Sequence, residues 1–204
     1  MKCGPKRLAV LASGGGRSLE NLCERIDAGD LDAVVELLIV DKESAGAKQR
    51  AERRGIPVVV VPKAADESPA VHSARIFEEL DCTPGGPPDL VVLAGFLKLL
   101  QLPAEWIGRV LNIHPSLLPA FGGRGYYGLH VHRAVLERGV QVTGCTVHYV
   151  DDQYDHGRIL LQRWIPVPGG IDAEALAALV FEEEKLALPA AIDKHFELQG
   201  AART

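Results

Sequence analysis

The chain has 204 residues, of which 47% are hydrophobic and 24% charged, so its length and composition suit one globular domain with a substantial core. Its formal net charge of -5 at pH 7 excludes a protein that holds a nucleic-acid backbone mainly by bulk positive charge. We therefore expect small-molecule substrates and no nucleic-acid partner, with the chain acting as a monomer or a homodimer.

The four cysteines lie far apart, without the C-x-x-C spacing of a zinc site or the density of a disulfide scaffold. The basic N-terminus is followed by only five apolar residues, and no apolar run approaches the ~18 residues of a membrane span. These features predict a cytoplasmic protein with reduced thiols, with neither secretion nor membrane insertion.

In the first half, apolar runs alternate with amphipathic segments. Strands are predicted at 7–12, 34–40, 56–61 and 90–94, and helices from Ser18 to about 28, at 45–54 and at 68–80. This βαβαβ order is typical of a parallel sheet with helices on its faces.

A glycine-rich turn, Ser13-Gly-Gly-Gly-Arg-Ser18, joins the first strand to the first helix, and Ser18 is expected to cap that helix. Backbone N–H groups at such a turn face outward beside the positive end of the helix dipole, which suits phosphate. A plain tight turn without a ligand is the alternative, and this stretch alone does not decide between them.

The second half changes character after a strand at 109–113. A loop rich in glycine and aromatic residues, at 121–128, precedes a helix at 130–138. Two strands with alternating polarity, at 142–150 and 159–165, are predicted to form a hairpin, and a last helix is predicted over 173–196. Pro189 is expected to kink or interrupt that helix. The fold class is α/β, a mostly parallel sheet with flanking helices and a C-terminal antiparallel hairpin.

Asn112 and His114 lie where a strand stops at Pro115, because proline removes a ladder donor. An amide and an imidazole thus leave one strand end, which is where ligands bind in open α/β sheets. Alone, this pair would more often be a turn cap and a surface histidine.

The motif Asn112-x-His-Pro-Ser-Leu-Leu-Pro, together with 143–151 and Asp155-x-Gly157, resembles the signature of folate-dependent formyltransferases, in particular the phosphoribosylglycinamide formyltransferase family of purine synthesis. The match covers nearly the whole chain. It implies a single Rossmann-like domain over 1–204, with a phosphate-binding half at about 7–110 and a catalytic and folate-binding half at about 111–204.

The resemblance assigns a catalytic trio to Asn112, His114 and Asp155. In formyl transfer an amine attacks a formamide-like carbon, and an amide N–H₂ and an imidazolium can stabilise the charge that develops on its oxygen. A carboxylate can accept the proton that the amine loses. This chemistry needs no metal, and we assign none to the remaining histidines, of which His148 is interpreted as a core residue.

The resemblance also implies substrate contacts. The ribose phosphate would lie at Gly16, Arg17 and Ser18, where the family has Gly-Ser-Asn, and Glu184 would meet the amine of glycinamide ribonucleotide. The co-substrate 10-formyltetrahydrofolate would contact Leu97, Lys98, Leu99, Leu100, Asn112, Asp151 and Asp152. For Glu184 the alternative is a solvated position on a helix face, and for Lys98 it is the start of an amphipathic helix. Arg124 is expected either to add a phosphate contact or to mark a mobile lid.

Three other activities compete with this one. A 10-formyltetrahydrofolate hydrolase and a formyltransferase for another sugar amine would use the same trio, whereas a non-enzymatic nucleotide-binding module would use only the glycine turn. The chain is expected to lack room for the additional domains of methionyl-tRNA formyltransferase or of the hydrolase.

Overall fold

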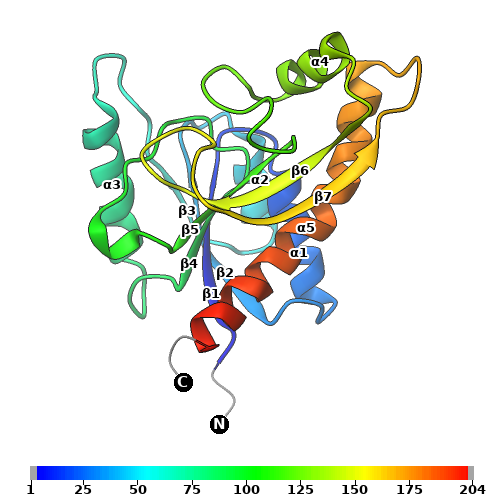
Figure 1. Ribbon diagram of the computed structural model, residues 1–204. Coiled ribbons are helices and arrows are strands. Elements are labelled where there is room, and N and C mark those ends of the chain that lie inside the picture. Colours follow the sequence, from blue (N-terminus) through cyan, green and yellow to red (C-terminus); the bar gives the residue numbers. More distant parts are fainter. Residues whose placement is uncertain (1–3, 202–204) are drawn as a thin grey trace. The chain divides into compact units, whose positions relative to one another are not determined.

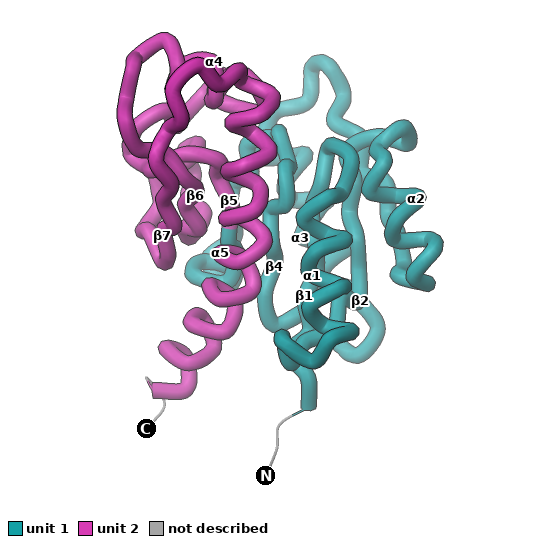
Figure 2. The backbone as a smooth tube through the Cα atoms, turned by 90° about the vertical axis from the view of Figure 1, so that its right-hand side faces the viewer, with its two compact units in different colours: residues 1–111 teal, residues 112–204 magenta. Residues whose placement is uncertain are grey.

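The computed structural model describes residues 4–201, and the chain forms two compact units, 1–111 and 112–204 (Figure 2). The division falls inside one strand, β5 (Val110–His114). Sequence reasoning placed a boundary between two halves of one domain at about the same residue, and the single domain stays a prediction.

Unit 1 contains four parallel strands in the order β3-β2-β1-β4. They are β1 (Lys6–Ala12), β2 (Ala33–Val40), β3 (Val58–Val60) and β4 (Leu90–Leu93). The central strands are buried almost throughout, as parallel strands covered on both faces require.

Helices cover the strands of unit 1. They are α1 (Arg17–Asp27), α2 (Gly46–Arg53), α3 (Pro69–Asp81) and a short 3-10 helix, Ala104–Trp106, that the sequence did not predict. In Figure 1, α3 lies on the opposite side of the strands from α1 and α2. Ser68 caps α3, its hydroxyl accepting from the N–H of Val71 at 3.3 Å.

Unit 2 is built on an antiparallel hairpin of β6 (Val142–Tyr149) and β7 (Ile159–Pro166). Its helices are α4 (Leu129–Arg138) and the long α5 (Ala173–Ala201), which packs against both hairpin strands (Figure 1). The described residues therefore confirm the predicted α/β fold, with mostly parallel strands and an antiparallel C-terminal pair.

Three local predictions were wrong. Gly16 rather than Ser18 is the N-cap of α1, because the chain enters the helix through a left-handed conformation, φ 76°, that glycine adopts without strain. Strand β3 is shorter than the apolar run at 56–61. Pro189 lies inside α5 without interrupting it, since contacts with β6 and β7 compensate for one missing backbone hydrogen bond, and the alternative of a kink stays a prediction.

Over residues 4–201, no helix combines the length and the apolar character that crossing a membrane would require.

Candidate active site

Strand β5 presents Asn112 and His114 on one face, because residues two apart in a strand point the same way. Asp155 comes from the loop between β6 and β7. Its Oδ2 lies 3.3 Å from Nδ1 of His114, and its Oδ1 accepts from Nδ2 of Asn112 at 3.2 Å. Unit 2 therefore brings together the three residues that the motif selects.

Both ring nitrogens of His114 face acceptors. Nε2 lies 2.8 Å from the carbonyl oxygen of Phe121, and Nδ1 faces the Asp155 carboxylate. Only the doubly protonated ring can donate to both at once. The ring is buried, with 4% of its side chain exposed, so its orientation is fixed by these two partners.

His148, interpreted from the sequence as a core residue, belongs to this site. Its Nε2 lies 3.0 Å from Nδ2 of Asn112 and 3.7 Å from Oδ1 of Asp155, while Nδ1 lies 2.8 Å from the Tyr149 carbonyl. A ring that donates from Nδ1 and accepts at Nε2 is neutral and satisfies both contacts. His148 thus orients the Asn112 amide.

The Asp155 carboxylate is held ionised by its partners. Burial raises the pKa of this carboxyl, but the hydrogen bond with the His114 ring, and after it the one from the backbone N–H of Gly123 at 2.9 Å, outweigh that effect and lower the pKa far below its usual range. The side chain is 10% exposed. In this hydrogen-bonded state the carboxylate is ionised and is a weak base.

Backbone strain gathers at the same place. Phe121 and Asp155 have φ of 54° and 53°, and within residues 4–201 they are the two residues other than glycine with positive φ. Such conformations cost about 1–3 kcal/mol each and cluster at functional sites. At Gly122, next to Phe121, a Cβ would displace the tip of the Leu118 side chain and would lie 3.2 Å from the Cβ of Asp155.

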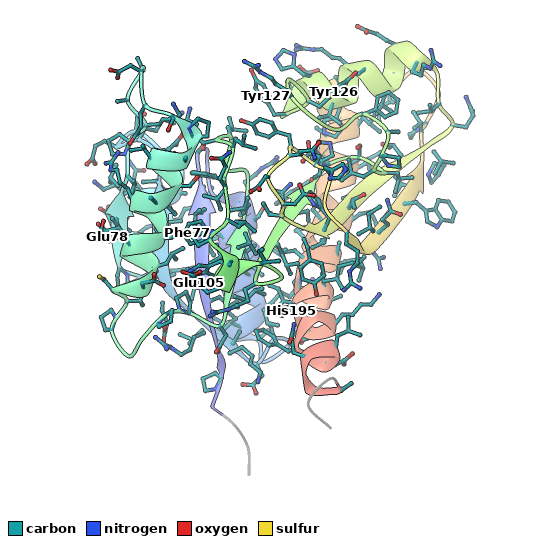
Figure 3. All side chains as sticks on the ribbon, turned by 60° about the vertical axis from the view of Figure 1, so that its left-hand side comes forward. Phe77, Glu78, Glu105, Tyr126, Tyr127 and His195 are labelled. Atoms are coloured by element: carbon teal, nitrogen blue, oxygen red, sulfur yellow. The ribbon has the colours of Figure 1, made fainter. Side chains whose placement is uncertain are left out.

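The loop that follows Pro119 thus supplies two backbone groups, the carbonyl of Phe121 and the N–H of Gly123, that sequence reasoning missed. No side-chain pattern reports a backbone contact. The loop continues through Tyr126 and Tyr127, which precede α4 in the chain and are labelled in Figure 3. The ring of Tyr126 meets that of Phe121 edge-on, with 6.5 Å between the ring centroids.

In unit 1, the glycine turn has its carbonyl groups directed into the protein. The Gly14 carbonyl accepts from the N–H of Ala47 at 3.0 Å, and the Gly15 carbonyl accepts from Nε of Arg50 at 2.8 Å. The N–H groups of Gly14, Gly15 and Gly16 donate no hydrogen bond within residues 4–201. Three backbone donors in succession thus have no partner within residues 4–201, and they lie at the start of α1, where the helix dipole is positive.

The other predicted contacts are placed as follows. In unit 1, Arg17 and Ser18 are the first residues of α1. Leu97 is exposed, Leu99 is half-buried and Leu100 is buried. Lys98 forms an ion pair with Asp41 at 3.5 Å. In unit 2, Asp151 accepts from His156, Asp152 is exposed, and Glu184 is half-buried on α5. Lys98 therefore already has a carboxylate partner within its own unit.

Among the residues that the structure describes, no group of three or more His, Cys, Asp or Glu side chains has an arrangement able to hold a metal ion.

Comparison with known proteins identifies the family. The model of the formyl transferase family matches residues 6–192. The chain belongs to the formyl transferase family. A chloroplastic phosphoribosylglycinamide formyltransferase of Vigna unguiculata is 46% identical over 187 residues, which are 88% of this chain and 57% of that protein. The trifunctional purine biosynthetic protein adenosine-3 of Drosophila melanogaster is 39% identical over 191 residues, 92% of this chain and 14% of that protein.

Solved structures of the same family superpose well. Phosphoribosylglycinamide formyltransferase from Bacillus halodurans gives a TM-score of 0.84 at 34% identity, with 96% of this chain and 97% of that chain covered. Glycinamide ribonucleotide transformylase 1 from Symbiobacterium toebii gives 0.83 at 37% identity, with 92% and 86% covered. The chain spans about 57% to 61% of the length of the curated plant relatives at 46% and 43% identity.

Proposed function

We propose that this formyl transferase family member moves a formyl group from 10-formyltetrahydrofolate to the amine of glycinamide ribonucleotide, in purine biosynthesis. The observation that carries the proposal is the buried ionised Asp155 between the Asn112 amide and the His114 ring. The relatives named above support the choice of substrates.

In this mechanism the amine attacks the formyl carbon directly, and its oxygen becomes negative. The His114 Nδ1–H and one N–H of Asn112 stabilise that oxygen, because donors aimed at developing charge act strongly in a buried site. Both donors are engaged with Asp155 before substrate binds. The formyl oxygen would therefore compete with the carboxylate for them.

Asp155 accepts the proton that the attacking amine loses, and the folate N10 gains one as the C–N bond breaks. Release of donors to the oxygen makes the carboxylate a better base at the moment a proton becomes available, because its pKa is low only while those hydrogen bonds last. His148 keeps the Asn112 amide oriented throughout.

Substrate contacts are part of the proposal. The free N–H groups of the turn at Gly16, with Arg17 and Ser18, would bind the phosphate of the amine substrate, and Glu184 its glycinamide part. Residues 97–100 together with Asp151 and Asp152 would hold the folate. We also propose a monomer or homodimer located in the cytoplasm, which fractionation tests directly, since the plant relatives are named chloroplastic.

The test is an assay with purified protein, 10-formyltetrahydrofolate and one of three acceptors: glycinamide ribonucleotide, another phosphorylated sugar amine, or water. Deformylated folate and formylated amine are measured together. Equal amounts of both with glycinamide ribonucleotide alone would support the proposal. If another sugar amine is formylated as fast as glycinamide ribonucleotide, the substrate assignment is wrong. If folate is deformylated and no formylated amine appears, the protein is a hydrolase.

A further inference from the structure

A network of buried side-chain hydrogen bonds holds residues 116–121, the segment whose Phe121 carbonyl contacts His114. Thr146 of β6 is 0% exposed, and its Oγ1 makes three hydrogen bonds. It donates to the Ser116 carbonyl at 2.7 Å and accepts from the N–H of Leu118 at 3.0 Å and from Nε2 of Gln162 at 2.9 Å. Every hydrogen-bonding position of this hydroxyl is occupied.

Gln162 of β7 extends the network to the same segment. Its side-chain amide donates to the Leu118 carbonyl at 3.0 Å as well as to Thr146. Both amide hydrogens are thereby used, and Leu118 is held through its N–H and its carbonyl. Two strands of the hairpin thus hold residues 116–118 by side chains rather than by ladder bonds.

The C-terminal end of this segment, at Ala120 and Phe121, fixes the orientation of the His114 ring. The Ser116 hydroxyl donates to the Ala120 carbonyl at 2.6 Å and lies 3.5 Å from the carbonyl of Phe121, which accepts from Nε2 of His114. Because the Phe121 carbonyl occupies Nε2, Nδ1 is the nitrogen left to face Asp155 and the reacting atoms. Movement of residues 116–121 would therefore rotate or release the ring.

We propose that Thr146 and Gln162 are positioning residues for His114, which act by fixing residues 116–121 so that the Phe121 carbonyl orients the imidazole. None of these side-chain hydrogen bonds within the described residues goes to His114, Asn112 or Asp155: they go to residues 116 and 118 and to each other. Their effect on rate rests on the proposed function, but their effect on the ring does not, so the two can be tested separately.

The experiment compares Thr146→Val, which removes the hydroxyl at nearly constant volume, with Thr146→Ser, which keeps it. Thr143→Val is the matched control, because Thr143 is 2% exposed on the same strand and its hydroxyl has no hydrogen-bond partner in the described structure. We expect Thr146→Val to lower kcat by ~10-fold or more with KM values unchanged, since a small displacement of a catalytic group is costly. Thr146→Ser and Thr143→Val should stay near the parent kcat.

A second readout needs no activity. The Nε2–H of His114, hydrogen-bonded to a carbonyl, should give a protected nitrogen-bound proton signal in NMR, assigned by its loss in His114→Ala. This signal should vanish in Thr146→Val and persist in Thr146→Ser and Thr143→Val. Gln162→Met, which lacks both donors, should weaken it in the same way and provides the comparison if Thr146→Val does not fold. A Thr146→Val protein with an unchanged signal and unchanged kcat would overturn the proposal, whatever reaction the enzyme catalyses.

Discussion

At the scale of single residues, the site depends on competition for hydrogen bonds. Asp155 takes donors from His114, Asn112 and the backbone of Gly123, so its charge is satisfied before substrate arrives. In the proposed mechanism, a substrate oxygen that recruits the same donors would free the carboxylate to act as a base. The two functions of the site are thereby coupled through one set of N–H groups.

His114→Ala and Asp155→Asn should each lower kcat by at least ~10², because each removes either a donor to the oxyanion or the proton acceptor. Steady-state kinetics with near-UV circular dichroism to confirm folding would measure this. His156→Ala is the control, since His156 is exposed and pairs only with Asp151 among the contacts described. Normal turnover in a folded His114→Ala protein would exclude the mechanism.

The lowered pKa of Asp155 predicts how stability depends on pH. The carboxyl binds fewer protons in the folded state than in the unfolded chain, so its contribution to stability is present above the unfolded pKa of about 4 and is lost as pH falls below it. Thermal unfolding of the parent and of Asp155→Asn should therefore differ most near pH 7. A difference that grew toward pH 3 would contradict this assignment.

At the scale of elements, helix α2 shapes the glycine turn that precedes α1. A Cβ at Gly16 would lie 2.6 Å from Cα of Ala47, so the two segments approach as closely as glycine allows. Arg50 of α2 binds the Gly15 carbonyl and also Glu20 of α1, at 3.2 Å. It therefore turns the carbonyl away from the free N–H groups and neutralises a carboxylate that would repel an anion.

Arg50→Ala should raise KM for the phosphorylated amine by ~10-fold, the effect of losing one hydrogen bond from a charged donor, and leave KM for the folate unchanged. Arg53→Ala removes the same charge from an exposed position on the same helix and should change neither constant. Both constants are measured with each substrate varied in turn. If KM rises equally for both substrates, the substitution has disturbed the packing of the strands, and the turn is not an anion-binding site.

At the scale of the whole chain, sequence patterns predicted the buried strands well because parallel strands need continuous apolar runs. The motif also selected the three side chains that lie together in unit 2, Asn112, His114 and Asp155, and their catalytic role stays a prediction. The Phe121 carbonyl and the Gly123 N–H were not predicted, because the loop conformation that places them depends on positive φ at Phe121 and on buried bonds from Thr146. Such contacts have no periodicity that a sequence could show. His148 was interpreted as a core residue, because it lies on a strand that is buried almost throughout.

The whole reaction must also be protected from water, because a formyl donor beside an oxyanion site can be hydrolysed as well as transferred. A transferase avoids this when the binding energy of remote parts of the amine positions its nitrogen at the formyl carbon. In this chain the phosphate turn at Gly16 and Glu184 are the proposed anchors. Glu184→Ala should then weaken use of the amine without any gain in folate hydrolysis.

The measurement follows deformylated folate with and without glycinamide ribonucleotide, and we expect the rate without amine to be below ~1% of the rate with it, since the amine supplies the positioning energy. Glu182→Ala is the matched control, because Glu182 is exposed two residues away and pairs with Lys185. If Glu184→Ala and Glu182→Ala behave alike, Glu184 is a solvated helix residue and the anchor lies elsewhere. If the parent rate does not depend on the amine at all, water is the acceptor and the chain is a hydrolase.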